Sequence, residues 1–166
     1  MVVPLMTRWL YLKYGTQDTV SGPILGTSSF LIAFAVLTVP ALARRLGVVK
    51  AIVFTQGAST LFMFATPLSP NYLVASIVYV IRAFLMNMSS PLQQSLIMGL
   101  VAEDERGAAS GINAALWTLP NSMSTSIGAA LMGAGMLEAP FYLATLLYCI
   151  SISIFWVAFG KMKLPE

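Results

Sequence analysis

Arg82 is the residue whose type and position most clearly imply chemistry. It lies about 15 Å into the apolar segment 72–101, because a helix rises about 1.5 Å per residue. A permanent cation at that depth is costly unless it faces water or protein. We predict that Arg82 lines an aqueous cavity and binds an anionic or acceptor-rich ligand, or pairs with a carboxylate outside this chain. The alternative is a structural arginine that bonds to backbone carbonyls of neighbouring helices.

Further polar and polarisable side chains share the helix face of Arg82 when residues are spaced about 100° apart. The opposite face of the same segment is apolar, with Ile77, Phe84 and Met88. The segment is therefore predicted to be a helix with one cavity-lining face, which carries Tyr79, Met86, Ser89, Ser90 and Gln93.

A second stripe of this kind lies on the segment 108–137. Its proline can kink a helix and release a backbone carbonyl, which suits a moving element. Its tryptophan can stack on a ligand or pack in the core, and its asparagines can bond a ligand or a neighbouring helix. We expect the stripe to contribute to the same cavity through Asn113, Trp117, Pro120, Asn121 and Ser124.

The residue types that are missing exclude several classes of chemistry. The chain has no histidine and a single cysteine, Cys149, so histidine-based catalysis, histidine-ligated metal and an internal disulfide are all ruled out within it. No Asp or Glu lies in a predicted span, so no carboxylate for proton coupling is visible there. We predict no catalytic residue, no metal and no cofactor, and the chain is not expected to be an enzyme.

The composition shows which solvent surrounds these elements. Charged residues make up 9% of the 166 residues and hydrophobic residues 58%, with a mean hydropathy of +0.83. Soluble domains contain about 25% charged residues. The sequence therefore predicts an all-α, polytopic membrane bundle, and a span needs about 20 apolar residues. Five segments qualify: 20–43, 48–66, 72–101, 108–137 and 140–160.

The first 14 residues offer only about half a span, roughly 18 Å of apolar helix. We interpret them as the second half of a spanning helix and expect the chain to be a fragment of a longer protein.

The basic residues predict the orientation, because cytoplasmic loops are enriched in Lys and Arg. Arg8 and Lys13 lie on one side of the predicted membrane. The other side carries Arg44, Arg45, Lys50, Arg106, Lys161 and Lys163. We therefore expect a multi-pass protein of the cell membrane with a cytoplasmic C-terminus.

Three motifs, in this order and topology, resemble the C-terminal half of a major facilitator superfamily transporter. They are "PALARRLGVVKA" at 40–51, "YVIRAFLMNMSSP" around Arg82, and "VAEDERGAASGINAA" at 101–115. In the first motif Pro40 stands where the family has Gly, and Arg44 where it has Asp. The resemblance covers essentially the whole chain. It implies that residues 1–14 end the family's helix seven and that the five spans are helices eight to twelve.

This resemblance implies a permease that moves a small solute, with efflux as one direction, by alternating access between two halves. The partners would be the solute, the bilayer and a missing N-terminal half, with no nucleic acid. Gating contacts at the cytoplasmic turns would involve Arg44, Arg45, Gly47, Lys50, Glu103 and Arg106. For the acidic turn, a solvated helix cap is the simpler interpretation. The alternative functions are a non-catalytic membrane scaffold and, less in keeping with the residues, a polytopic membrane enzyme.

Overall fold

The structure is a computed structural model that describes residues 2–16 and 18–160. The described part is all-helical, with 88% helix and no strand, which confirms the predicted class. Its elements are α1 (Val2–Tyr14), α2 (Asp18–Leu46), α3 (Val48–Ala65), α4 (Tyr72–Leu100), the short 3-10 helix η1 (Glu103–Glu105), α5 (Arg106–Gly133) and α6 (Ala139–Phe159). Lys161 and Lys163 lie outside the described residues.

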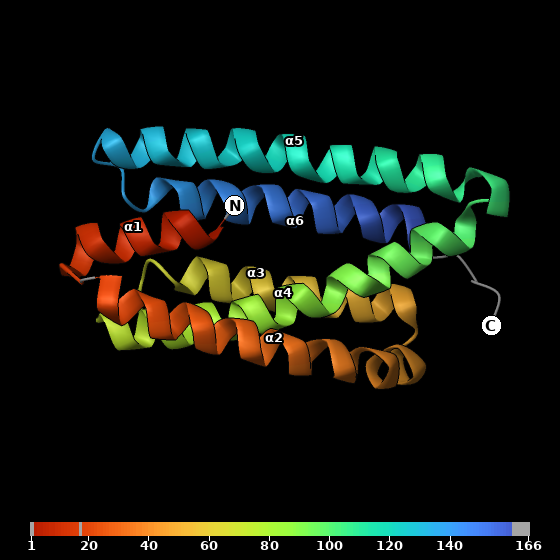
Figure 1. Cartoon of the computed structure of the whole chain (residues 1–166), viewed down its shortest axis with the longest axis horizontal. Coiled ribbons are helices and arrows are strands. Elements are labelled where there is room, and N and C mark those ends of the chain that lie inside the picture. The colour runs from red at the N-terminus through yellow and green to blue at the C-terminus, as the bar shows by residue number, and fades with distance from the viewer. Residues whose placement is uncertain (1, 17, 161–166) are drawn as a thin grey trace.

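The helices run back and forth along the long axis of the molecule (Figure 1). The turns that follow α1, α3 and α5 lie at one end, and the turns that follow α2 and α4 lie at the other, together with the end of α6. The second end is named the basic end, because it carries Arg44, Arg45, Lys50 and Arg106. The grouping of these cations follows from the alternation of the helices, as the sequence predicted.

Four helices are long and apolar enough to cross a membrane among the described residues: they are α2, α3, α4 and α6. The fifth predicted span, at 108–137, corresponds to α5, which has 28 residues but is not among the four. Its length suffices, whereas its many Ser, Thr and Asn side chains lower its hydropathy. A helix of this composition needs protein or water along its polar side.

The helix ends follow local rules. Arg44 and Arg45 form the last turn of α2 rather than a separate loop, and cations are favourable at a helix C-terminus. The chain then reverses at Gly47, whose φ of 80° lies in the left-handed region that glycine adopts without steric cost. At the start of α4, the Asn71 side chain accepts a hydrogen bond from the Val74 backbone N–H.

Two buried apolar clusters hold the bundle together. The first joins α1 to α4, α5 and α6 and contains Leu5, Met6, Trp9, Leu10, Ala75, Tyr79, Met132 and Phe141. The second joins α2, α3 and α4 and contains Ala35, Val39, Ala51, Ile52, Met88, Leu92 and Leu96. Because lipid is as apolar as these side chains, close packing rather than escape from water stabilises such contacts.

The helix α5 is packed much less than its neighbours. Its buried residues are Gly128 and Met132, both in its second half. A Cβ at Gly128 would lie 2.6 Å from Leu5 Cδ1, so glycine permits α1 to approach here. Most of α5 is therefore exposed on this chain, and the exposed part includes its polar stripe.

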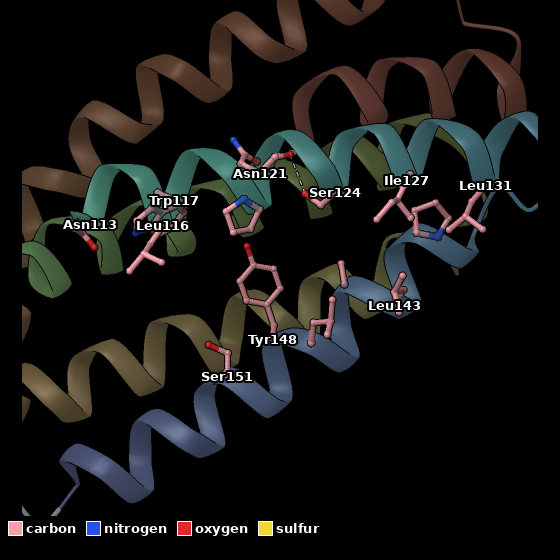
Figure 2. Close-up of a pocket in the computed structure, with 15 residues that line it drawn as sticks. Asn113, Leu116, Trp117, Asn121, Ser124, Ile127, Leu131, Leu143, Tyr148 and Ser151 are labelled. Atoms are coloured by element: carbon pink, nitrogen blue, oxygen red, sulfur yellow. Dashed lines mark hydrogen bonds between the residues drawn. The ribbon is translucent and has the colours of Figure 1, made fainter. Parts of the chain in front are cut away.

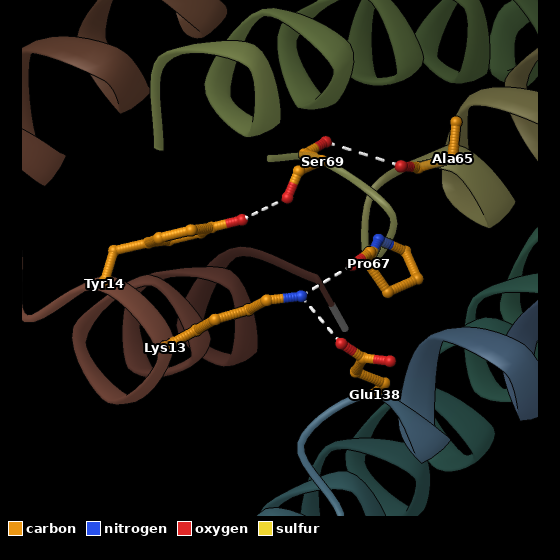
Figure 3. A network of polar contacts seen from close by, with 6 residues as sticks. All are labelled: Lys13, Tyr14, Ala65, Pro67, Ser69 and Glu138. Atoms are coloured by element: carbon orange, nitrogen blue, oxygen red, sulfur yellow. Dashed lines mark hydrogen bonds and ion pairs between the residues drawn. The ribbon is translucent and has the colours of Figure 1, made fainter. Parts of the chain in front are cut away.

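A polar network ties three turns together at the end of the bundle opposite the basic end (Figure 3). Lys13 Nζ donates to the Pro67 backbone oxygen at 2.6 Å and to Glu138 Oε1 at 2.7 Å. The Tyr14 hydroxyl donates to the Ser69 backbone oxygen at 2.6 Å. Lys13 also lies 5.0 Å from the centre of the Trp9 ring. The end of α1 is thereby bonded to both the α3–α4 and the α5–α6 turns.

Replacing Lys13 by methionine is expected to lower the free energy of unfolding by about 1–3 kcal/mol, because it removes two charge-assisted hydrogen bonds. Glu138→Gln is the matched control, because it keeps an acceptor at a position that is 44% exposed, so its cost should stay below about 1 kcal/mol. Both changes in the free energy of unfolding are measured by unfolding the variants in mixed micelles with an increasing fraction of SDS. Equal losses in the two variants would contradict the role given to the Pro67 carbonyl.

Candidate functional site

Two adjacent cavities lie along the weakly packed helix α5. The first, named the α4–α5 cavity, has a volume of about 310 Å³. Its walls are mainly hydroxyl and amide side chains, and they consist of Ser90, Gln93, Gln94, Ile97, Ser110, Asn113, Ala114, Trp117 and Thr118. Cavities of this size hold small solutes, and polar groups in such a cavity orient the ligand.

The second cavity, named the α5–α6 cavity, has a volume of about 430 Å³ and is mostly apolar (Figure 2). Leucines from both helices form much of its wall, and the Tyr148 side chain extends from α6 toward α5 near Asn121. Asn113 and Trp117 line both cavities, so the two spaces meet at these residues.

Half of the predicted cavity residues are brought together here. Gln93, Asn113 and Trp117 line the α4–α5 cavity, and Asn121 joins the last two in the α5–α6 cavity. Pro120 and Ser124, from the same predicted stripe, also line the α5–α6 cavity.

The stripe predicted on α4 divides into two parts. Ser90 and Gln93 reach the α4–α5 cavity. Tyr79, Arg82 and Ser89 are buried, and Met86 is half-buried; none of these four lines either cavity. The predicted aqueous surface around Arg82 is thus replaced by protein, because the residue is buried, with Ser59 of α3 and Tyr148 of α6 beside it.

Arg82 is only 5% exposed. Ser59 Oγ on α3 donates to the Arg82 backbone oxygen at 3.2 Å. The phenol groups of Tyr79 and Tyr148 lie within electrostatic range of the guanidinium. Arg82 Nε is buried without a hydrogen-bond partner. Two phenols therefore lie near the cation, and no described carboxylate forms an ion pair with it.

The hydroxyls along α5 are satisfied within the helix. Thr118, Ser122 and Thr125 each donate to the backbone oxygen four residues earlier, at 2.8, 3.0 and 2.9 Å. This arrangement lowers the cost of a hydroxyl in an apolar setting. The side-chain amides of Gln93 and Asn113 form no hydrogen bond within the described part of the chain, so they can bond a ligand.

The residues predicted to form a gate share the basic end, although no ion pair joins the acidic turn to Arg44 or Arg45 among the described residues. Arg44, Arg45, Gly47 and Lys50 are exposed. Glu103 pairs at 3.5 Å with Arg106 in its own turn. Over residues 2–16 and 18–160 no ion pair joins Glu103 to Arg44 or Arg45, which agrees with the interpretation of the acidic turn as a solvated helix start.

Tyr148 and Ser151 are cavity residues that the sequence did not indicate. They lie three residues apart on α6, a mostly apolar helix, and that spacing was the only available signal.

No protein-family model, curated protein or solved structure matches this chain. Among the described residues no group of three or more Asp, Glu, His or Cys side chains could hold a metal ion. The functional assignment therefore rests on the geometry of the membrane helices and the two cavities.

Proposed function

We propose that this chain moves a small solute across the cell membrane by alternating access, as the C-terminal half of a transporter of the major facilitator type. The α4–α5 cavity is the observation that carries the proposal. It places the amides of Gln93 and Asn113 and the ring of Trp117 around one space, between two helices of membrane length. Such groups can bind a solute by hydrogen bonding and stacking while it crosses.

The exposed polar side of α5 supports a second half as partner. Asn113 is only partly buried, and Trp117 and Asn121 are exposed on this chain. Polar groups of this kind within a membrane face other protein or water. A partner half that covers α5 would convert the α4–α5 cavity into a central site. The basic end would face the cytoplasm, in keeping with the distribution of Lys and Arg.

Alternating access predicts that the α4–α5 cavity meets water on both sides of the membrane in turn. We expect Gln93→Cys and Asn113→Cys, each in a Cys149→Ser background, to react with a charged, membrane-impermeant thiol reagent. The reaction should proceed in both right-side-out and inside-out vesicles, because a thiol becomes reactive where water allows the thiolate to form. Cys149 must be replaced because it is exposed.

Ile150→Cys is the control, because Ile150 is 48% exposed on the apolar helix α6 and lines neither cavity. It should react at least about tenfold more slowly than the cavity positions, since lipid suppresses ionisation. Reaction from one side only would contradict alternating access and would indicate a static water-filled pocket. No reaction from either side would favour the scaffold function, in which α5 serves only to hold a partner.

A further inference from the structure

The α5–α6 cavity differs from the α4–α5 cavity in both chemistry and position. Its volume of about 430 Å³ falls in the range of ligand sites. Leu116 and Leu131 of α5 and Leu143 and Leu147 of α6 line it, and Asn121 and Tyr148 lie between its leucine-lined ends. A site of this kind suits a molecule that is largely apolar and carries one polar group.

Tyr148 connects this cavity to the buried cation. Its ring lies in the cavity wall (Figure 2), and its phenol lies near enough to the Arg82 guanidinium to interact with it electrostatically. The O–H of the same phenol can then donate to a ligand. The nearby cation favours an anionic acceptor at this hydroxyl.

The charge near this phenol is not neutralised by the described carboxylates. Glu138 pairs with Lys13 and Glu103 with Arg106, and both pairs lie at the ends of the bundle. Asp104 and Glu105 are exposed in η1. Arg82 is only 5% exposed, and its Nε has no hydrogen-bond partner. A buried cation in this state favours a negatively charged ligand group nearby.

The depth of the Tyr148 hydroxyl in the bilayer distinguishes a phospholipid from a free amphiphile as the ligand that supplies the apolar chain. Tyr148 follows the start of α6 by nine residues, about 14 Å, which is close to the bilayer middle. Phospholipid head groups stay at the membrane surface. A free amphiphile can place its acidic group at that depth, where Arg82 offsets the cost.

We propose that the α5–α6 cavity binds an amphipathic monocarboxylic acid of the fatty-acid type. The carboxylate accepts a hydrogen bond from the Tyr148 hydroxyl beside Arg82, and the chain lies between the leucines of α5 and α6. This site does not depend on the proposed transport, because binding at equilibrium tests it.

Trp117 supplies the reporter, because it lines the cavity and bromine atoms quench tryptophan fluorescence on contact. The full chain in phosphatidylcholine nanodiscs is titrated with 9,10-dibromostearic acid, with its neutral methyl ester, and with a phospholipid brominated in its acyl chains. We expect saturable quenching by the acid. The acid should bind at least about tenfold more tightly than the ester, because only the acid can accept a charge-assisted hydrogen bond. Trp117→Phe should remove this saturable signal.

Tyr148→Phe removes the hydroxyl and should weaken binding of the acid about tenfold. Binding of the ester should be unchanged, which would show that the cavity remains intact. Tyr142→Phe is the matched control, because Tyr142 lies on the same helix, packs against Phe64 and is not in the cavity wall. Equal affinity for acid and ester would overturn the proposal. So would unchanged acid binding in Tyr148→Phe, or equal quenching by the brominated phospholipid, which would mean that bilayer chains fill the cavity.

Discussion

Arg82→Met should raise the free energy of unfolding by about 2–3 kcal/mol, because a cation in the membrane interior is costly and this one has no carboxylate partner among the described residues. Methionine keeps an unbranched stem of similar length, so packing against α3 and α6 is preserved. The same variant should lose the preference for dibromostearic acid over its methyl ester. A residue retained at the expense of stability, and needed for binding, is the mark of a functional site.

Arg45→Met is the control for this substitution. Arg45 is exposed in the last turn of α2, where the helix dipole contributes less than about 1 kcal/mol. The unfolding of both variants in mixed micelles gives the comparison. If Arg82→Met destabilises the chain by more than about 1 kcal/mol and acid binding is unchanged, Arg82 is a structural residue, as the alternative interpretation held.

Trp9→Ala is expected to have the largest destabilising effect, about 2–4 kcal/mol. The Trp9 side chain is fully buried, at 0% exposure, and its ring contacts Tyr14 and Phe141 edge-on, with centroids 5.6 and 5.2 Å apart. Its loss would leave a cavity where α1 meets α6 and would remove the aromatic neighbour of Lys13. The expected cost is at the lower side of that in soluble cores, because lipid rather than water is the competing solvent.

Two companion variants make this prediction specific. Trp9→Phe should cost less than about 1.5 kcal/mol, because the buried Trp9 Nε1 forms no hydrogen bond that phenylalanine would forfeit. Trp156→Ala removes the same side chain at a position that is 44% exposed, and its effect should stay near 0.5 kcal/mol, the usual limit for surface sites. A similar loss in Trp9→Ala and Trp156→Ala would mean that α1 is not anchored through Trp9.

The α4 stripe shows both the reach and the limit of sequence reasoning. Helical periodicity placed Arg82, Ser90 and Gln93 on one face, and Ser90 and Gln93 do reach a common cavity. Periodicity gives the angle of a side chain around its own helix, but not which neighbour covers each level of that face. The structure places Ser59 of α3 at the Arg82 backbone oxygen and Tyr148 of α6 near its guanidinium.

The α5 stripe was easier to predict, because its position in the cavities depends on fewer neighbours. Asn113, Trp117 and Asn121 line cavities mainly because α5 is thinly covered. Tyr148 was missed for the converse reason: one of two phenols on a mostly apolar helix becomes informative only when the helix that faces it is known.

The sequence by itself determined the helical class, the presence of helices apolar enough to cross a membrane, the approximate helix bounds and the shared end of the basic turns. These follow from local causes, because backbone groups in lipid must bond within their own helix and each turn reverses the chain. The tertiary structure alone decided which side chains meet: Lys13 with Glu138, Leu5 with Gly128, and Arg82 with Tyr148. Those pairs depend on the rotation and depth of each helix against its neighbours, which close packing sets and no single segment encodes.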